Sequence, residues 1–499
     1  MFRRCVKFVV VLLSIFSSSL FAQWSEIVQI TSGEFDDRNP TFASLPWPGY
    51  GYDGLVFART DSSGTNICVK RTTLNGRGWE SDVTYITQDS FLNTSPSIAC
   101  IPYYYPNSTD KIMILWQTNR NRNNDIYYSC GDGFNWSLPM PINTNSSEDI
   151  NPQVARFDTT FIAVWESDGL IKVSFFLNNE WSLPMNISDS FANTEPKVTS
   201  TQGSMPVIFW DKIVGDSVRV LYSILKNNTW CTPRLLKTLS DKSNLSITKM
   251  ADNFGNIQVA WDQKGETDIE VYGRNSYFNY DTLQWGVESN LSNDDIVHNK
   301  NASSILMPVI WKETEQFFYY DLVAFEDSSF SDNQIHVKGM YMYEDAIFNT
   351  NGLDKNPDVS CGVLDTQIWP YPFNVWVVWQ SNEGGRWHLV GSYTTIYTWG
   401  VEDENTPEAF KLYQNYPNPF NPTTTISFRL TKPTIMRLEI YNTLGVKVKT
   451  YFEENLQAGE HKIIWDGKDD KGRSLPSGVY CYRFTTDKSA QTRKMLLLR

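Results

Sequence analysis

The sequence predicts an all-β protein, in which a ring of repeated four-stranded units is followed by a small β-sandwich. Aromatic residues make up 14% of the chain, with 18 Trp and 25 Tyr, and aromatic side chains are enriched in β-strands. A set of short alternating segments recurs every 44 to 57 residues from Asn39 to Asn356. The charge also changes sign near residue 410, which indicates a domain boundary there.

The first element of each repeat has alternating residues and, in its clearest copies, starts with a Pro-containing pair. The clear copies begin at Asn39, Ser95, Asn151, Glu195 and Asn356, and two weaker copies begin at Asn244 and Asn301. The second element is an apolar run that ends in an aromatic residue. These aromatic residues are Phe57, Trp116, Trp165, Trp210, Trp261, Phe325 and Trp379.

A third alternating strand follows, and the fourth begins at another Trp. The segment 136–143 (WSLPMPIN) nearly repeats as 181–188 (WSLPMNIS), and looser versions begin at Trp79, Trp230 and Trp285. Four short strands in each repeat are typical of the blades of a β-propeller. A single blade cannot bury its aromatic face alone, so neighbouring blades must cover it.

The ends of the repeat region predict how the ring closes. Residues 24–31 (WSEIVQIT) resemble a fourth strand without the three that should precede it, whereas the seventh unit ends after its third strand, near residues 391–398. We therefore expect the N-terminal strand to complete the last blade, because this removes the unpaired edge. The prediction is a seven-bladed propeller over residues 23–400. The sixth unit lacks a Trp near residues 346–348, so a six-bladed ring is the alternative.

The N-terminus has the features of a secretory signal peptide. Arg3, Arg4 and Lys7 precede an apolar run over residues 8–16 and a small-residue segment, so we expect cleavage after Ala22. The mature chain has no apolar window long enough for a transmembrane segment. Residues 401–409 are acidic and contain Pro, which indicates a linker.

Charge and residue counts restrict the ligand classes. Residues 23–409 contain 48 acidic and 25 basic residues, a net charge of −23, whereas residues 410–499 contain 8 and 15, a net charge of +7. An acidic surface argues against nucleic acid as a partner. The chain has only four His and no CxxC spacing, which argues against a metal cluster, and no cofactor is evident. Calcium binding is kept as an alternative, although no specific motif supports it.

Residues 410–499 carry a set of short motifs in a fixed order. They are Asn415, Pro417, Asn418, Pro419, Phe420, Asn421, Pro422, Gly445, Trp465, Asp466, Gly467, Gly478 and Tyr480. This set resembles the type A C-terminal sorting domain of the type IX secretion system of Bacteroidota. The resemblance implies an Ig-like sandwich and export through the periplasm and outer membrane. It also implies recognition by the secretion machinery, followed by display on the cell surface or release.

The turn before the fourth strand resembles the Asp-box of sialidase-like and BNR propellers. Residues 129–136 (SCGDGFNW) keep the Ser, Gly and Trp positions, but the Asp is displaced by one. In that family the Asp-box is a structural turn remote from the catalytic centre. A sialidase site would also need converging arginines, for which Arg38, Arg156 and Arg274 are the candidates. We expect them to be separate surface or strand-end residues.

An acidic or amide residue follows most second-strand aromatics. These residues are Glu166, Asp211, Asp262, Glu326, Gln117 and Gln380. Recurrence in successive blades favours a structural role, in which the side chains bind backbone in the adjoining turn. A ring of acids that binds a cation or a glycan is the alternative. Residues 466–472 (DGKDDKG) contain several carboxylates but lack the spacing of an EF-hand, so we expect a hairpin turn.

No complete catalytic set is present, and we assign no catalytic, cofactor-binding or metal-binding residue. The sequence therefore favours a non-catalytic module that binds an extracellular glycan or protein. A diverged sialidase-like glycoside hydrolase is the alternative, and a structural surface-layer component is a third hypothesis. The fold alone does not decide among them.

Overall fold

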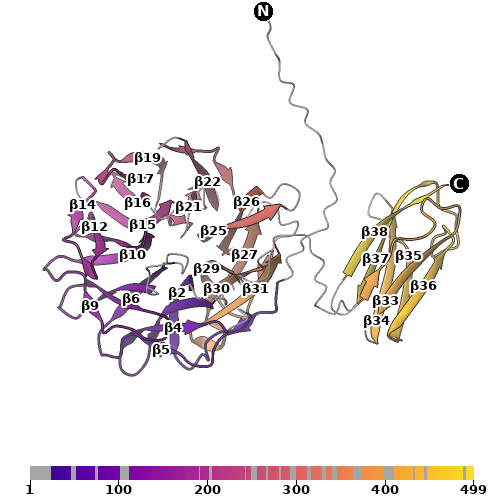
Figure 1. Cartoon of the computed structure of the whole chain (residues 1–499), viewed down its shortest axis with the longest axis horizontal. Coiled ribbons are helices and arrows are strands. Elements are labelled where there is room, and N and C mark those ends of the chain that lie inside the picture. Colours follow the sequence, from indigo (N-terminus) through magenta and orange to yellow (C-terminus); the bar gives the residue numbers. More distant parts are fainter. Residues whose placement is uncertain are drawn as a thin grey trace, which may run out of the picture. The chain divides into compact units, whose positions relative to one another are not determined.

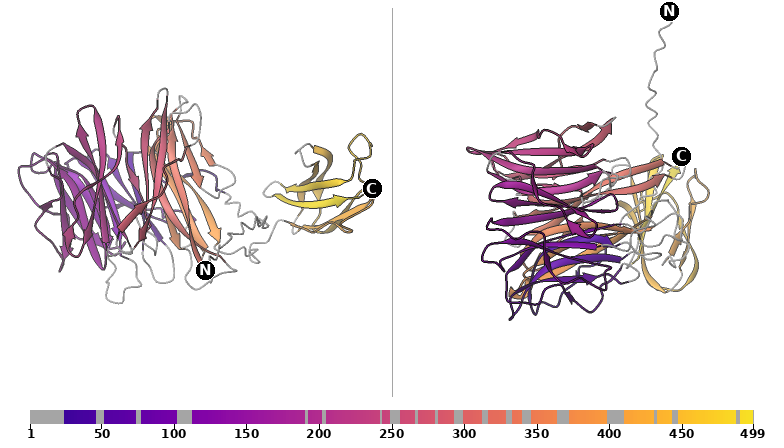
Figure 2. Two further views of the ribbon diagram at one scale, coloured as in Figure 1. Left: turned by 90° about the horizontal axis from the view of Figure 1, so that it is seen from above. Right: turned by 60° about the vertical axis from the view of Figure 1, so that its left-hand side comes forward.

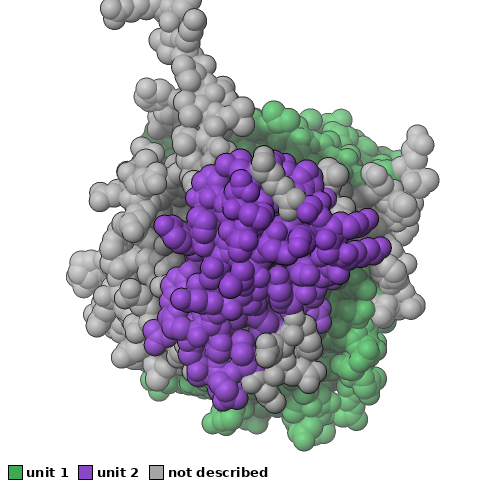
Figure 3. Space-filling view, turned by 90° about the vertical axis from the view of Figure 1, so that its right-hand side faces the viewer, with its two compact units in different colours: residues 1–400 green, residues 401–499 purple. Residues whose placement is uncertain are grey.

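The computed structural model describes residues 24–45, 52–73, 77–101, 112–189, 192–201, 205–241, 243–248, 256–265, 268–279, 282–292, 299–311, 316–328, 333–339, 346–363, 372–397, 410–430, 433–442, 447–486 and 490–498. The chain divides into two compact units, Met1–Gly400 and Val401–Arg499, which are coloured separately in Figure 3. The expected signal peptide with its cleavage site after Ala22, the expected linker 401–409 and Gly445 lie outside the described residues. Among the described residues, no helix has the length and hydropathy of a membrane span.

The described residues of unit 1 form seven antiparallel sheets, numbered here in chain order. Sheets one to three contain β2 (Asp36–Leu45), β3 (Tyr52–Thr60), β4 (Thr65–Arg71) and β5 (Thr84–Tyr85); β6 (Asn93–Cys100), β7 (Ile112–Thr118), β8 (Asp125–Gly131) and β9 (Met140–Pro141); and β10 (Asp149–Phe157), β11 (Thr160–Ser167), β12 (Leu170–Leu177), β13 (Glu180–Trp181) and β14 (Met185–Asn186).

Sheets four to seven continue the same order of strands. They contain β15 (Asn193–Thr201), β16 (Met205–Val214), β17 (Ser217–Lys226), β18 (Thr229–Trp230) and β19 (Arg234–Leu239); β20 (Ser246–Ile247), β21 (Gln258–Lys264), β22 (Ile269–Asn279), β23 (Thr282–Trp285) and β24 (Ser289–Asn290); β25 (Asn299–Trp311), β26 (Gln316–Asp327), β27 (Gln334–Gly339) and β28 (Ala346–Phe348); and β29 (Asp354–Val363), β30 (Pro372–Ser381), β31 (His388–Tyr397) and β1 (Val28–Gln29). A short 3-10 turn, η1 (Glu383–Gly385), connects β30 to β31.

The first strands of the sheets surround a common centre (Figure 1). Each contacts the first strand of the sheet before it and of the sheet after it, in the cycle β2, β6, β10, β15, β20, β25, β29 and back to β2. Figure 2 shows the sheets standing side by side around unit 1. This arrangement is a β-propeller, as the repeat predicts.

Two sets of aromatic residues fill the spaces between the sheets. The Trp or Phe residue that ends each second strand is at most 1% exposed. Where the fourth strand carries a Trp, that residue packs on the preceding sheet, as Trp181 does on Tyr128, with ring centroids 5.8 Å apart. Trp285 packs on Tyr222 in the same way, at 5.6 Å. The repeated aromatic residues therefore serve blade packing, as their recurrence predicts.

The N-terminal strand closes the ring. β1 pairs antiparallel with β31, Val28 opposite Gly391. Ser25 Oγ accepts a hydrogen bond from the Tyr393 amide at 3.1 Å, and Ser392 Oγ donates to the Ser25 carbonyl at 2.9 Å. Trp24 packs edge-on against Phe348 of β28, at 5.5 Å. The prediction that residues 24–31 complete the last blade is confirmed, and β28 is the expected Trp-less fourth strand of the sixth sheet.

Unit 2 is a two-layer β-sandwich. One sheet contains β32 (Phe410–Leu412), β33 (Thr424–Leu430) and β36 (Gly459–Trp465), and the other contains β35 (Lys447–Leu456), β34 (Thr434–Asn442), β37 (Gly478–Thr486) and β38 (Ala490–Leu497). The core includes Trp465, which packs on Phe420 and Tyr480 with ring centroids 5.5 and 5.4 Å away. Three of the motif residues are therefore part of the hydrophobic core.

Replacement of Trp24 tests the closure. Trp24→Ala should lower the free energy of unfolding of the full chain by about 2 kcal/mol or more, because it removes an inter-sheet aromatic contact. Trp181→Ala is the matched control, since Trp181 occupies the same place inside the ring. Denaturant unfolding should show similar losses for both variants. A Trp24→Ala variant as stable as the wild type would contradict the closure.

Candidate functional site

One face of the propeller repeats the same backbone feature. We call it the start face, because the first strand of each sheet begins there and the second and third strands meet there in a turn. The repeat residues on it have φ between 41° and 54°. They are Asn39, Ser95, Asn151, Glu195, Asn244, Asn301 and Asn356. Asn tolerates this left-handed conformation better than most residues, which explains why five of the seven are Asn.

The acidic and amide residues after the second-strand aromatics join adjacent sheets at this face. Gln380 Oε1 accepts a hydrogen bond from the Asn39 amide and Gln117 Oε1 accepts one from the Asn151 amide, each at 2.9 Å. Four acids make the equivalent link to the next sheet, through the pairs Glu166–Thr194, Asp211–Ser243, Asp262–Asn301 and Glu326–Asn356. These contacts confirm the predicted structural role, but the predicted partner was wrong: the side chains bind the next sheet and not the backbone of the adjoining turn. The first sheet has Ala58 at this position.

Burial changes the ionisation of these acids. Asp262 is 6% exposed, and the loss of water around its carboxylate raises its pKa from 3.8 to about 7. The nearby charge of Glu326 raises it further, while hydrogen bonds from Asn244 and Asn301 oppose the shift. Burial likewise raises the pKa of Glu326, which is fully buried. These carboxyl groups are engaged between sheets and are poorly placed to meet a ligand.

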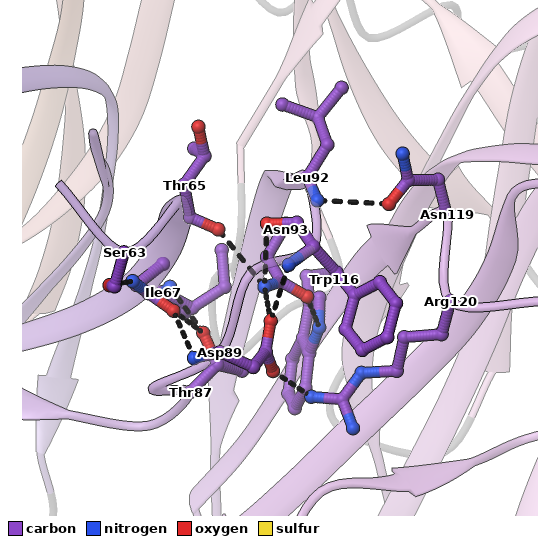
Figure 4. A network of polar contacts seen from close by, with 12 residues as sticks. Ser63, Thr65, Ile67, Thr87, Asp89, Leu92, Asn93, Trp116, Asn119 and Arg120 are labelled. Carbon is purple, nitrogen blue, oxygen red and sulfur yellow. Dashed lines mark hydrogen bonds and ion pairs between the residues drawn. The ribbon is translucent and has the colours of Figure 1, made fainter. Parts of the chain in front are cut away.

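A second polar contact joins sheets one and two at the same face (Figure 4). Asn93 is fully buried; its amide group donates to the Thr65 carbonyl at 2.9 Å, and its Oδ1 accepts from Trp116 Nε1 at 3.1 Å. Asn193 repeats both contacts, with the Gly169 carbonyl and Trp210 Nε1. A buried amide that satisfies both a Trp and the neighbouring sheet fixes the spacing of the blades.

The Asp-box-like turns lie at the opposite face, in the hairpins that join third and fourth strands. Ser129 Oγ donates to the Ser137 carbonyl at 2.8 Å, and Ser174 makes the same bond to Ser182 at 2.7 Å. The displaced Asp132 accepts hydrogen bonds from the Phe134 and Asn135 amides at 2.8 and 2.6 Å. These residues hold the turn, in agreement with a structural role.

The three candidate arginines do not come together. Arg38 precedes the left-handed residue of β2 and pairs with Asp36 at 3.0 Å. Arg156 follows the left-handed residue of β10 by five positions, which places it about 17 Å further along the strand direction. Arg274 lies on a third strand, β22, and binds Glu288 at 3.2 Å. Their separation gives no arginine triad.

The start face carries a depression at the seam between the last and first sheets. Its volume is about 530 Å³. Its lining comes from the start of β2 and the segment before it, from the end of β3 and the turn that follows, and from the turn between β30 and β31. The lining residues are Glu34, Phe35, Asp36, Arg38, Thr60, Asp61, Ser62, Gly385, Arg386 and Trp387. Among these, only Arg38 belongs to the sequence-derived candidates.

Two half-buried aromatic rings form the apolar part of the depression. The guanidinium of Arg38 lies 5.3 Å from the Trp387 ring centre, and that of Arg59 lies 4.6 Å from the Phe35 ring centre. The Arg59 guanidinium is in turn fixed by a buried bidentate ion pair with the Asp37 carboxylate. The two N–O distances are 2.7 and 2.9 Å. The Asp37 amide donates to the Trp387 carbonyl at 2.8 Å. The Phe35 ring is thus held by the Arg59 cation. The Trp387 ring is held by the Arg38 cation and by the hydrogen bond to the Trp387 carbonyl.

The other predicted motifs are structural. In the 466–472 segment, Asp469 accepts hydrogen bonds from the Lys471 and Arg473 amides at 2.9 and 2.8 Å and pairs with the Arg473 side chain. The segment is a hairpin turn, as expected. Within the described part of the chain, no group of three or more His, Cys, Asp or Glu residues could hold a metal ion.

The sorting-motif residues divide into buried and exposed groups. Asn415, Phe420, Trp465 and Tyr480 are at most 4% exposed. Gly467 is also buried, with φ of 69°, and Gly478 is half-buried. The exposed members are Pro417, Asn418, Pro419, Asn421, Pro422 and Asp466.

Comparison with known proteins supports the fold of unit 2. A model of the FlgD Ig-like domain matches residues 416–490, which agrees with the predicted Ig-like sandwich. No curated protein matches the chain.

Among solved structures, a fungal alcohol oxidase with copper is 10% identical, with a TM-score of 0.46 over 96% of this chain and 100% of the other. A Trypanosoma rangeli sialidase with the inhibitor DANA is 9% identical, with a TM-score of 0.37 over 93% of this chain and 85% of the other. Likeness at this level assigns no activity or ligand.

The raised pKa of Asp262 predicts a pH dependence. The folded protein keeps a proton on this carboxyl up to about pH 7, whereas the unfolded chain releases it near pH 4. This contribution to stability is therefore complete below about pH 4 and is lost as the pH rises to about 7. Asp262→Asn keeps an acceptor for Asn301 and removes the titration.

The measurement is urea unfolding of the full chain at pH 4.5 and pH 7.5. Relative to the wild type, Asp262→Asn should gain about 1 kcal/mol or more between the two pH values. Gln117→Glu is a useful comparison, because it places a titrating group at the equivalent link. A constant difference between Asp262→Asn and the wild type would refute the assignment.

Proposed function

We propose that the chain is an exported, seven-bladed β-propeller that binds an extracellular glycan in the start-face depression. The observation that carries the proposal is the depression itself, with Phe35 and Trp387 beside a set of charged side chains. The seven sheets found among the described residues support the blade count.

The chemistry of the lining suits a sugar. The flat faces of Trp387 and Phe35 can pack against the C–H groups of a pyranose ring, and Arg38, Asp36 and Asp61 can exchange hydrogen bonds with its hydroxyl groups. A concave site with an apolar floor and a few fixed polar groups is the usual form of a small-ligand pocket. Arg38 and Arg386 would also favour a glycan that carries a carboxylate or sulfate.

A binding role is supported over hydrolysis. Candidate arginines that a sialidase-type site would need are far apart, and the recurring carboxylates are engaged between sheets. Glu34, Asp36 and Asp61 remain in the depression, so a glycan that binds on the array is also the substrate for a separate hydrolysis assay.

The export route rests on the two ends of the chain. Residues 1–22 serve as a signal peptide, cleaved after Ala22, and residues 410–499 serve as a type IX sorting domain that the outer-membrane secretion machinery recognises. The Ig-like match over residues 416–490 supports the domain type. The protein then acts on the cell surface or after release.

Loss of Trp387 tests the binding site. On a glycan array, Trp387→Ala should reduce the wild-type signal at least about tenfold, because half-buried aromatic residues anchor ligands. Phe134→Ala is the matched control: Phe134 also stacks with an arginine, Arg71 at 3.8 Å, but lies in a hairpin of the opposite face. Equal array signals from Trp387→Ala and the wild type would show that the glycan binds outside the depression. If folded wild-type protein binds no glycan on the array, the ligand is instead a protein.

Truncation tests the export route. A chain that ends at Asn405 should accumulate in the periplasm of a host with the type IX system, whereas the full chain should reach the surface or medium. Cell fractionation with a periplasmic marker measures the difference. Surface delivery of the truncated chain would contradict the proposed sorting role.

A further inference from the structure

The C-terminal strand of unit 2 lies at the edge of its sheet. The strand order is β35-β34-β37-β38, so β38 pairs with β37 on one side only. An edge strand exposes N–H and C=O groups to water or to another chain. The outward groups of β38 belong to alternate residues, which include Lys494 and Leu496.

The motif segment 414–420 covers this edge in place of another strand. Leu496 donates its amide to Asn418 Oδ1 at 2.9 Å, and the Phe420 amide donates to the Leu496 carbonyl at 3.0 Å. Leu498 donates to the Phe420 carbonyl at 2.9 Å, and Gln414 Nε2 donates to the Lys494 carbonyl at 2.7 Å. The motif segment 414–420 is thus hydrogen-bonded to successive outward N–H and C=O groups of residues 494–498, about 80 positions later in the sequence.

The same segment presents apolar side chains to solvent. Tyr416 is 82% exposed, although its backbone is fixed by two hydrogen bonds with Thr425 of β33, at 2.9 and 3.0 Å. Pro417 and Pro419 are exposed beside it, and Leu498 is 47% exposed at the end of the covered edge. A large aromatic residue held this rigidly in water contributes little to the core and is well suited to recognition.

We propose that Tyr416, Pro417, Pro419 and Leu498 form one composite recognition surface, which Asn418 holds in register and which binds an acidic protein surface of the export machinery. This inference rests on the proposed sorting function. The acidic character of the partner follows from charge complementarity, because residues 410–499 have a net charge of +7 and Lys494 is exposed on the covered edge strand β38. A recess for the Tyr416 ring is the second feature that the partner needs.

The sorting motif contains two similar asparagines, one of which can serve as the control for the other. Asn418 and Asn421 are both exposed and are both followed by Pro. Asn418 binds the Leu496 amide, whereas Asn421 has no hydrogen-bond partner among the described residues. A sorting signal that is read as a linear motif would need both asparagines, but a composite surface needs only Asn418.

The experiment compares full-length Asn418→Ala, Asn421→Ala, Tyr416→Ala and a chain that lacks residues 410–499. Export is measured by cell fractionation, and hydrogen exchange at the Leu496 amide is measured on the purified full chains. Asn418→Ala should speed this exchange about tenfold, because one hydrogen bond is lost, and should lower export several-fold. Tyr416→Ala should lower export as much without faster exchange, and Asn421→Ala should change neither.

The outcomes separate this inference from the sorting function. Normal export of the chain without residues 410–499 would overturn the sorting function itself. If that deletion blocks export but Tyr416→Ala is exported normally, the composite surface is overturned and the sorting function stands. Equal defects in Asn418→Ala and Asn421→Ala, or unchanged Leu496 exchange in Asn418→Ala, would also overturn it.

Discussion

Antiparallel pairing of β1 with β31 is the contact on which the propeller depends. Without it, the last sheet would end in an open third strand, although β2 would still contact β29, β30 and β31 across the seam. An open edge of this kind invites pairing with other chains. The closure joins residues that are more than 360 positions apart, so it connects the two ends of the whole repeat region.

The closure also creates the candidate site. The chain leaves β1, passes through residues 30–35 and enters β2. The start of β2 lies against the turn before β31, where the Asp37 amide donates to the Trp387 carbonyl. Phe35 and Trp387 face one depression only because the two ends of the repeat region meet there. The proposed binding site therefore depends on the same contacts that close the ring.

Much of this architecture can be predicted from the sequence, because repetition makes it visible. The second-strand aromatics, the Trp-Ser fourth strands and the N-terminal closing strand all occupy their predicted places. The acids after the aromatics are inter-sheet links, as their recurrence suggests. The seam residues are different: Phe35 and Trp387 belong to no repeat, and only the closure brings them together. The edge contact of Asn418 was equally hidden, since a sequence motif gives no sign of which asparagine bonds to a distant strand.

Amide hydrogen exchange on the full chain tests the closure most directly, because the ring contains a matched reference. The Tyr393 amide donates to Ser25 Oγ and the Phe175 amide donates to Ser182 Oγ, both at 3.1 Å. If β1 completes the last sheet as firmly as an internal fourth strand, the two amides should exchange at rates within about tenfold of each other. Exchange at Tyr393 that is orders of magnitude faster than at Phe175 would show an open ring and would contradict this account.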